Sequence, residues 1–557
     1  MKVPRFTPRQ SGLAAAVIAA LAAVALLLTS AGVGARPARA DASASIPCAA
    51  NTDVAISSGP ICGLTVNTTD EWFGIPYAAP PVGQLRWQPP QPPAPWTTTL
   101  QATTFGSECT QSFGAGAALQ GSEDCLFINV WAPAGGAANL PVLVHIHGGG
   151  FVYGNGNGDN TLLSSAGHEV VVSFNYRLGI FGFLADSALG RNSGDYGLED
   201  QQAALRWVHN NVSKFGGNPR NVTIFGESAG GSSVCDQIAS PTARGLFERG
   251  ISVSGEYNTL LGAPNSLQQQ DCKSQLPTQA QSLAAGDKFA AAVACTTNVA
   301  SCLRNLPAAT AQSAAGGNGS AGIFFPAGFQ DGGLGTVAPT INGTTLTMTL
   351  RQALAAGRAN RVDVIAGTDR DENLVGSATT AAQYTAVVDS QFGQFAAQVL
   401  KLYPLSQFDS PGVAIRTVEA DSGTVCPSLE TARDLASRMP TYQYEIDDND
   451  LPPYSAASAA FAAQGASHVG AWFVTPQTTA LDANQQVLQD QEVAFVTAFA
   501  RNGNPNATSM PNWPTLGRNS EQVMSLQPAG DSELVSTSQM AADHNCAFWD
   551  QVAKSAP

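Results

Sequence analysis

A serine between glycines is the residue of this chain best suited to nucleophilic chemistry. Gly226 to Gly231 reads GESAGG, follows the apolar run Val222 to Phe225, and is followed by a helical pattern. A serine in G-x-S-x-G at a sharp turn from strand to helix projects its Oγ above a sheet, where it can attack an acyl carbon. With 55 glycines in the chain, roughly half a match is expected by chance. The flanking strand and helix, rather than the pattern alone, make Ser228 a candidate nucleophile.

A second glycine-rich segment offers a partner for that serine. His145 to Phe151 reads HIHGGGF and overlaps the end of another apolar run. Glycines at such a place can direct backbone N–H groups at a developing oxyanion. The bulky side chains of Phe151 and Tyr153 argue against a merely flexible loop, and the chain contains no G-x-x-x-x-G-K-[ST] phosphate loop. The two segments together indicate acyl transfer through a serine nucleophile.

The elements that must position these segments alternate along the chain. From about Asn139 onward, short β-branched runs alternate with helical patterns such as Leu198 to Val212, which is typical of a sheet with crossover helices. The predicted strands are Leu140 to His147, Val170 to Tyr176, Val222 to Phe225, Arg249 to Ser254, Val362 to Gly367 and Thr441 to Ile446. In open α/β sheets the chemistry lies at the carboxyl ends of the strands. Two Ala/Gly/Gln-rich stretches, Ala263 to Gly322 and Ser377 to Asp421, are predicted to be helical insertions over the sheet.

GESAGG and HGGGF occur in order with several further motifs. These are GIPYAAPPVGQLRW from Gly74, SEDCLFINVWAP from Ser122, NYRLG from Asn175, DYGLEDQ from Asp195, FGGNP from Phe215 and CAFW from Cys546. Through them the chain resembles the type-B carboxylesterase/lipase family, an α/β-hydrolase group that includes the cholinesterases. The resemblance implies an α/β fold of the α/β-hydrolase type. Its large, mostly parallel central sheet is flanked by helices, with helical insertions over the active site.

The resemblance also implies a catalytic triad, which runs Ser, Glu, His along the chain in this family. Ser228 is the expected nucleophile. Glu372 lies in an Asp-Glu-Asn sequence where the family has Asp-Glu-Gly, which makes it the expected acid. His468, in GASHVG after the Thr441 strand, is the expected base. Because Asn373 replaces the usual glycine, two neighbouring carboxylates remain alternatives for the acid: Asp369 and Asp371.

Further residues are expected to support the triad. The oxyanion is expected to bind the backbone N–H groups of Gly149, Gly150 and Ala229. Glu227 is interpreted as a hydrogen-bonding neighbour rather than a direct catalyst, because strand alternation points its side chain away from Ser228. Ser254 matches a family serine near the triad histidine and receives a supporting role only. No cofactor and no metal are expected.

Ten cysteines, an even number, suit disulfide pairing in an exported protein. Their spacing suggests three local pairs: Cys48 with Cys62, Cys109 with Cys125, and Cys295 with Cys302. The resemblance implies the second and third of these, and it adds Cys426 with Cys546. Cys235 and Cys272 then remain as a fifth pair. A zinc site is disfavoured, because no two cysteines have zinc-knuckle spacing and the chain has only six histidines.

The amino terminus resembles a secretory signal. Lys2, Arg5 and Arg9 precede the apolar run Gly12 to Leu28, and Ala-Arg-Ala ends at Ala40. We therefore expect residues 1–40 to be removed and residues 41–557 to form a single catalytic domain without a membrane anchor. The alternative is a transmembrane anchor, for which the apolar run is short.

The charge balance limits the classes of partner. The chain has 42 acidic and 27 basic residues and a net charge of −15, so it lacks the basic surface that nucleic acid requires. We expect a secreted monomer that acts on a small ester.

The loop between Cys109 and Cys125 bears on the identity of that ester. It has 15 residues and one aromatic, Phe113, without the tryptophan that binds choline in cholinesterases or the apolar lid of the family's lipases. Short-chain or aromatic soluble esters are therefore the expected substrates. One alternative is a lipase or sterol-esterase type of hydrolase that acts on longer acyl esters. Another is a non-catalytic, cholinesterase-like binding protein, although such members of the family have lost the serine that this chain retains.

Overall fold

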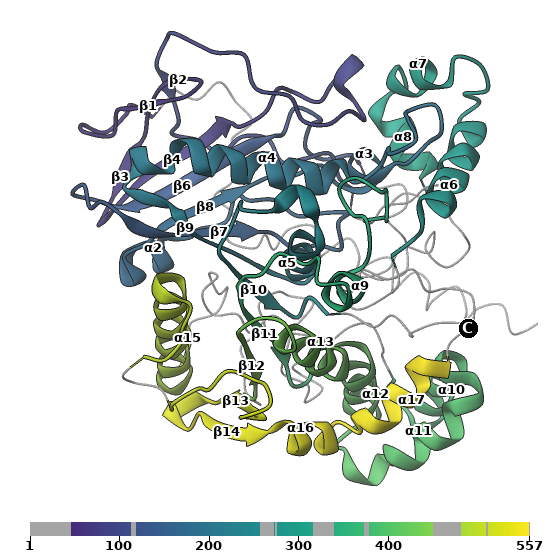
Figure 1. The fold of residues 1–557 in the computed structure, drawn as a ribbon. Coiled ribbons are helices and arrows are strands. Elements are labelled where there is room, and N and C mark those ends of the chain that lie inside the picture. The colour runs from purple at the N-terminus through teal and green to yellow at the C-terminus, as the bar shows by residue number, and fades with distance from the viewer. Residues whose placement is uncertain are drawn as a thin grey trace, which may run out of the picture.

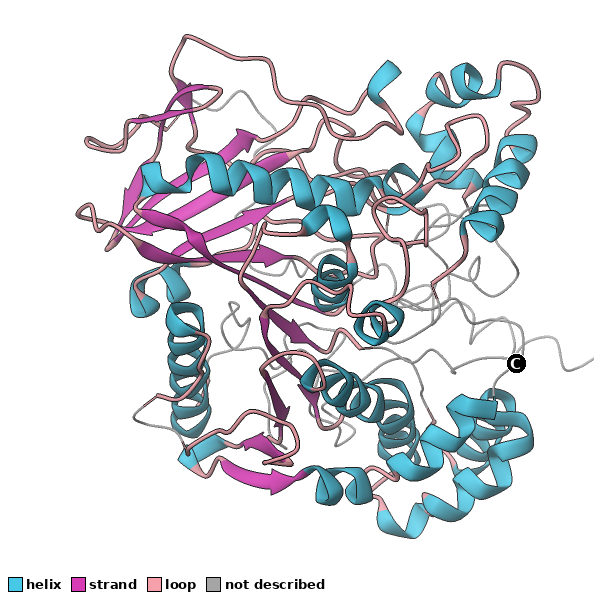
Figure 2. Ribbon diagram, viewed as in Figure 1, coloured by secondary structure: helices cyan, strands magenta, loops and turns pink. Residues whose placement is uncertain are grey.

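A large sheet runs through the protein (Figures 1 and 2). The computed structural model describes residues 46–112, 118–256, 272, 276–315, 339–372, 378–448, 481–507 and 511–555. Its eleven strands follow the order β14-β13-β12-β11-β10-β9-β7-β8-β6-β4-β3. They are β3 (Leu64–Val66), β4 (Thr69–Pro76), β6 (Phe127–Pro133), β7 (Leu140–Ile146), β8 (Val170–Phe174), β9 (Gly217–Glu227), β10 (Arg249–Val253), β11 (Asp363–Asp369), β12 (Thr441–Ile446), β13 (Gln522–Leu526) and β14 (Glu533–Ser536).

In sheet order, the seven strands β13-β12-β11-β10-β9-β7-β8 pair in parallel. The strands at either edge of the sheet, β14 on one side and β6, β4 and β3 on the other, pair antiparallel. A separate three-stranded sheet is formed by β1 (Val54–Ile56), β2 (Gly59–Cys62) and β5 (Leu100–Gln101). All six predicted strands are present, each end within two residues of the prediction except the beginning of β9. The sequence predicted the beginning of this strand at Val222, but Gly217 already lies opposite Leu140 of β7. The predicted large, mostly parallel sheet is confirmed.

Helices cover both faces of the sheet because side chains of the buried strands alternate between two apolar clusters. On β7, Val142 and Val144 contribute to the cluster that includes residues of α4, α5, α9 and α13, whereas Leu143 contributes to the cluster that includes residues of α2 and α15. These helices are α2 (Thr161–Gly167), α4 (Tyr196–Asn211), α5 (Ala229–Ala239), α9 (Leu350–Ala355), α13 (Cys426–Ala436) and α15 (Ala483–Asn502). Such two-sided burial explains why the central strands are near-continuous apolar runs.

Two groups of helices lie beyond the sheet, at the upper and lower right of Figure 1. The upper group comprises α6 (Gln279–Ala292), α7 (Val299–Arg304) and α8 (Ala308–Ala314), close to α3 (Gly179–Phe183). The lower group comprises α10 (Ala381–Phe392), α11 (Ala396–Leu402), α12 (Pro411–Ala420), α16 (Thr537–Asp543) and α17 (Cys546–Ser555). The helical character predicted for the two Ala/Gly/Gln-rich stretches is present where the structure describes them. Residues 263–271, 273–275, 316–322 and 377 lie outside the described residues.

The order of the strands fixes where a site can form. The chain passes from β7 to β8 on one side and then returns to place β9 on the other side of β7. In open α/β sheets, the usual ligand position lies beyond the carboxyl ends of the strands at such a reversal, which here are β7 and β9. Both glycine-rich segments follow these two strands.

None of the helices in the described ranges combines the length and the apolar composition needed to cross a bilayer. The apolar run Gly12 to Leu28 lies outside those ranges.

Five disulfides join the ten cysteines in the pairs expected from the sequence: Cys48–Cys62, Cys109–Cys125, Cys235–Cys272, Cys295–Cys302 and Cys426–Cys546. The last closes by far the longest loop, with a sequence separation of 120 residues. It joins the first residue of α13 to the first residue of α17.

Replacing Cys426 and Cys546 together with alanine should lower the free energy of unfolding by up to about 5 kcal/mol, because the bond restricts the unfolded chain in proportion to the logarithm of loop length. The matched control removes Cys295–Cys302, whose separation is 7 residues, and should cost only about 2 kcal/mol in the same entropy model. Urea unfolding under oxidising conditions measures both. A larger loss from the control pair would contradict the loop-length argument.

Candidate active site

Ser228 lies in the sharp turn between β9 and α5, in a backbone conformation unusual for a residue with a side chain. Its φ is 58° and its ψ is −126°. Hydrogen bonds hold the turn: the Ser228 N–H donates to the Val253 carbonyl at 2.9 Å, and the Ser232 N–H donates to the Ser228 carbonyl at 2.9 Å. The strain and the burial of Ser228, which is 9% exposed, are typical of a functional turn.

The glycines on either side of Ser228 are required by close packing. A Cβ at Gly226 would lie 2.4 Å from the Ile146 carbonyl oxygen, and a Cβ at Gly230 would lie 2.0 Å from the same oxygen. No side chain fits at such distances without moving the β7 backbone. The G-x-S-x-G pattern in this chain is therefore a consequence of how tightly the turn packs on the end of β7.

The glycine run after β7 reaches the same turn. A Cβ at Gly148 would lie 3.2 Å from the Ser228 Cβ. Gly149 and Gly150 have φ values of 103° and 60°, and a Cβ at Gly149 would lie 2.1 Å from the Tyr153 carbonyl oxygen. The structure thus brings the predicted oxyanion segment to the predicted nucleophile, with a backbone path that glycine alone adopts easily.

Sequence reasoning assigned no role to His147, which the structure places at the start of this run. Its Nδ1 lies 2.8 Å from the Gly148 carbonyl, which can only accept, so Nδ1 carries the proton. The ring stacks on Tyr176 at 4.3 Å, and the Tyr176 hydroxyl donates to the His147 carbonyl at 2.9 Å. Burial lowers the pKa of His147 to about 3, so the ring is neutral. His147 therefore fixes the path of the glycine run, and its place directly before three glycines was the available signal.

Glu372 lies just beyond β11 and is buried, with 5% exposure. The Ser254 hydroxyl, just beyond β10, donates to Glu372 Oε2 at 2.6 Å, and the Ser254 N–H donates to the Gly367 carbonyl at 2.7 Å. Because β9, β10 and β11 are parallel neighbours, Ser228, Ser254 and Glu372 leave the sheet at one edge. This is the edge that the sequence predicted for the site.

The charge of Glu372 is influenced by two other carboxylates. Burial raises the pKa of Glu372 well above its ordinary value, Asp369 and Glu227 raise it further, and the Ser254 hydrogen bond lowers it. Burial and the charge of Asp369 raise the pKa of Glu227 to about 7. A positive charge that formed beside the carboxylates of Glu372, Asp369 and Glu227 would be stabilised by them.

Glu227 differs from its sequence interpretation in one respect. Strand alternation suggested that its side chain points away from Ser228. In the structure, a Cβ added to Gly148 would lie 2.9 Å from Glu227 Oε2 and 3.2 Å from the Ser228 Cβ. The Glu227 and Ser228 side chains therefore both lie next to Gly148. The alternation ends at the turn, so the Glu227 carboxylate lies beside the glycine run.

His468, the predicted base, lies outside the described residues. The segment that contains it follows β12, the next parallel neighbour of β11. The predicted nucleophile, the predicted oxyanion segment and the predicted acid thus follow β9, β7 and β11, at one edge of the sheet.

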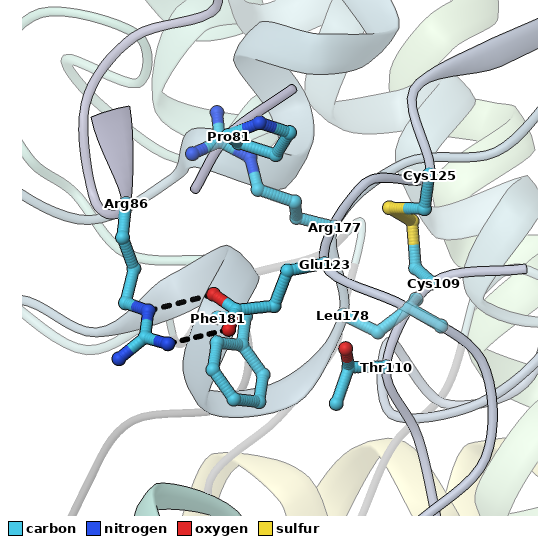
Figure 3. A pocket seen from close by; sticks show the side chains of 9 residues that line it. All are labelled: Pro81, Arg86, Cys109, Thr110, Glu123, Cys125, Arg177, Leu178 and Phe181. Carbon is cyan, nitrogen blue, oxygen red and sulfur yellow. Dashed lines mark hydrogen bonds and ion pairs between the residues drawn. A yellow bond between two sulfur atoms is a disulfide. The ribbon is translucent and has the colours of Figure 1, made fainter. Parts of the chain in front are cut away.

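A small cavity of about 10 Å³ lies at the base of the Cys109–Cys125 loop (Figure 3). It holds about one water molecule and is too small for an ester. Beside it, Arg86 pairs with Glu123 through two guanidinium nitrogens and also donates to the Leu306 carbonyl at 2.6 Å. These bonds fix the base of the loop, while its residues 113–117 lie outside the described ranges.

Comparisons with known proteins agree with this geometry. A sequence model of the carboxylesterase family matches residues 50–549. The para-nitrobenzyl esterase of Bacillus subtilis (strain 168) is 32% identical over 507 residues, which cover 86% of this chain and 94% of that protein. The fumonisin B1 esterase of Sphingopyxis macrogoltabida is 31% identical over 521 residues, which cover 88% and 90%.

A solved structure of a PNB esterase superposes with a TM-score of 0.70 at 27% identity, covering 89% of this chain and 99% of that one. The fold class expected from the sequence, an α/β-hydrolase, is confirmed by this likeness. The family match spans the sheet, Ser228, the glycine run and Glu372. The chain belongs to the carboxylesterase family, and it is a hydrolase of carboxylic esters.

Proposed function

We propose that the reaction proceeds through an acyl-enzyme on Ser228, with His468 as the general base and Glu372 as the carboxylate that orients it. The observation that supports this most strongly is the turn of Ser228, which packs against the glycine run and lies at the same sheet edge as Glu372, with only β10 between their two strands. A serine hydroxyl is a weak nucleophile until a neutral imidazole accepts its proton. The resulting imidazolium would be stabilised by Glu372 and then protonate the leaving alcohol.

The oxyanion of the tetrahedral intermediate is assigned to the N–H groups of Gly149, Gly150 and Ala229. Ala229 is the first residue of α5, and the first N–H groups of a helix have no partner within it. The positive φ values of the two glycines support the same assignment. Each such donor contributes about 3 kcal/mol to transition-state stabilisation. Water then hydrolyses the acyl-enzyme by the reverse sequence of proton transfers.

For substrates, we propose short-chain or aromatic esters. The Cys109–Cys125 loop is short, and the ion pair of Arg86 and Glu123 holds its base. One similar protein is named for para-nitrobenzyl esters, which are aromatic. The net charge of −15 favours neutral over anionic substrates.

We also propose that residues 1–40 direct export and that residues 41–557 act as one secreted, monomeric catalytic domain. The five disulfides support an oxidising destination.

Ser228→Ala should abolish ester hydrolysis without altering the unfolding midpoint, because it removes only the nucleophilic oxygen. Hydrolysis of p-nitrophenyl acetate measures the effect, and Ser213→Ala, at an exposed serine, is the matched control. Retention of most activity by Ser228→Ala would refute the mechanism.

Ser254→Ala removes the hydrogen bond to Glu372 and should lower kcat/KM roughly tenfold, the equivalent of one bond to a charged group. Loss of that donor raises the pKa of Glu372 further, so the acidic limb of the pH profile should move to higher pH. Ser254→Gly also lacks the hydroxyl but relieves the φ of 45°. If Ser254→Gly retained full activity, the hydroxyl would not be required and the hydrogen-bond explanation would fail.

Chain-length preference tests the substrate proposal. With p-nitrophenyl esters, kcat/KM should be highest for acetate or butyrate and should fall for palmitate, with no rise in rate when an emulsion forms. Faster hydrolysis of palmitate at an emulsion surface would instead establish the lipase type of specificity.

A further inference from the structure

A buried, doubly paired histidine lies outside the proposed catalytic steps. His544, which follows α16, is 3% exposed. Its Nδ1 lies 2.5 Å from Asp421 Oδ1, and its Nε2 lies 2.8 Å from Glu445 Oε1. Both ring nitrogens therefore lie within ion-pair distance of a carboxylate oxygen, with a hydrogen bond between Nδ1 and Asp421 and no hydrogen-bond geometry between Nε2 and Glu445. Two carboxylates at this distance favour the imidazolium form of the ring.

The electrostatics agree with that geometry. Burial alone would lower the pKa of His544, but Asp421 and Glu445 raise it well above its ordinary value. Asp371 interacts with both His544 and Arg370, and Asp543, the residue before His544, interacts with Arg370. The cation thus compensates buried carboxylates from two separate elements.

One side of this cluster leads to the segment that bears Glu372. Glu445 is a residue of β12, and its Oε2 lies 3.8 Å from Arg370 Nη1. The Arg370 guanidinium also pairs with Asp447 at 3.4 Å, and the backbone N–H of Arg370 donates to the Ile446 carbonyl at 2.9 Å. Arg370 directly follows β11 and stands two residues before Glu372. Glu445 therefore links the imidazolium to the exit of β11.

The other side of the cluster leads to the carboxyl-terminal helices. The Tyr403 hydroxyl donates to Asp421 Oδ2 at 2.7 Å, and the Trp549 indole donates to the Tyr403 oxygen at 2.7 Å. Asp421 begins a π-helical turn, Asp421–Val425, between α12 and α13. Such turns are rare and occur frequently at functional sites. The Cys426–Cys546 disulfide closes the same region.

We propose that His544 and Glu445 are positioning residues for ester hydrolysis, which act through Arg370 to hold Glu372 against Ser254. This inference rests on the proposed role of Glu372. The buried Glu445 carboxylate on β12, whose side chain is 4% exposed, needs a nearby cation. Because His544 lies beside one oxygen of Glu445 and Arg370 approaches the other, the Glu445 side chain contributes to the placement of the Arg370 segment, together with Asp447 and the Ile446 carbonyl.

The test is Glu445→Gln, which keeps the size of the side chain and removes its charge. We expect kcat to fall about tenfold with KM within twofold, because small displacements of a catalytic group affect the chemical step more than binding. The matched control is Asp363→Asn, which breaks the pair with Arg249 at the opposite end of β11 and should leave kcat unchanged.

A double variant identifies the route of the effect. If Glu445 acts through Glu372, then Glu372→Gln with Glu445→Gln should be no slower than Glu372→Gln alone. Multiplication of the two losses would overturn the inference. So would unchanged kcat in folded Glu445→Gln, even if its unfolding midpoint falls, because that result describes a purely structural pair.

Arg370→Gln keeps the inference falsifiable if Glu445→Gln does not fold, since the Arg370 side chain is 34% exposed and its loss is better tolerated. It should lower kcat to a similar extent, and an unchanged kcat would overturn the inference. Glu372→Gln measured in parallel separates the two proposals. If it retains full activity, the proposed role of Glu372 fails and the inference with it. If it loses activity while Arg370→Gln does not, only the inference fails.

Discussion

The contact between the Ser228 turn and the Ile146 carbonyl is the constraint on which the site depends. Gly226 and Gly230 both approach that oxygen more closely than any side chain allows. The turn can therefore form only where β7 ends, and the residues after β7 must leave the sheet beside Ser228. The glycine run and Ser228 thus meet at the Ile146 carbonyl, at the reversal of strand order between β7 and β9.

Much of this arrangement could be predicted from the sequence, because its signals are local. Six of the seven parallel strands could be predicted from β-branched apolar runs, and the turn from two glycines around a serine, whereas β13 was missed. The beginning of β9 was missed because Gly216, Gly217 and Pro219 indicate a break, whereas the pairing of Gly217 with Leu140 overrides that preference. The antiparallel strands before β7 were not predicted either. β3 has only three residues, and β4 pairs with β6 through a register shift between Trp72 and Ile75, which weakens the periodicity of β4.

The site residues likewise divide into those that a local motif identifies and those that it does not. Ser228 and the glycine run could be identified from their own motifs, whereas Glu372 needed the family pattern, since nothing local distinguishes it from Asp369 or Asp371. The structure adds that Glu372 Oε2 accepts the Ser254 hydroxyl. The roles of His147 and His544 depend on contacts with residues distant in sequence, such as Tyr176 and Asp421. No spacing rule predicts such contacts, because they arise only when the sheet has formed.

Disulfides and buried ion pairs both hold the segments that leave the sheet, but they have different effects. Disulfides act mainly by restricting the unfolded chain, so they stabilise a loop without dictating the position of each side chain. Buried ion pairs contribute little net stability, but removing one partner leaves an uncompensated charge that costs about 3 to 5 kcal/mol. The Cys109–Cys125 loop has both, with Arg86 and Glu123 at its base, and the region of Cys426–Cys546 has both, with His544 between two carboxylates. In each place the covalent bond limits how far the segment can move, and the ion pair selects one geometry within that limit.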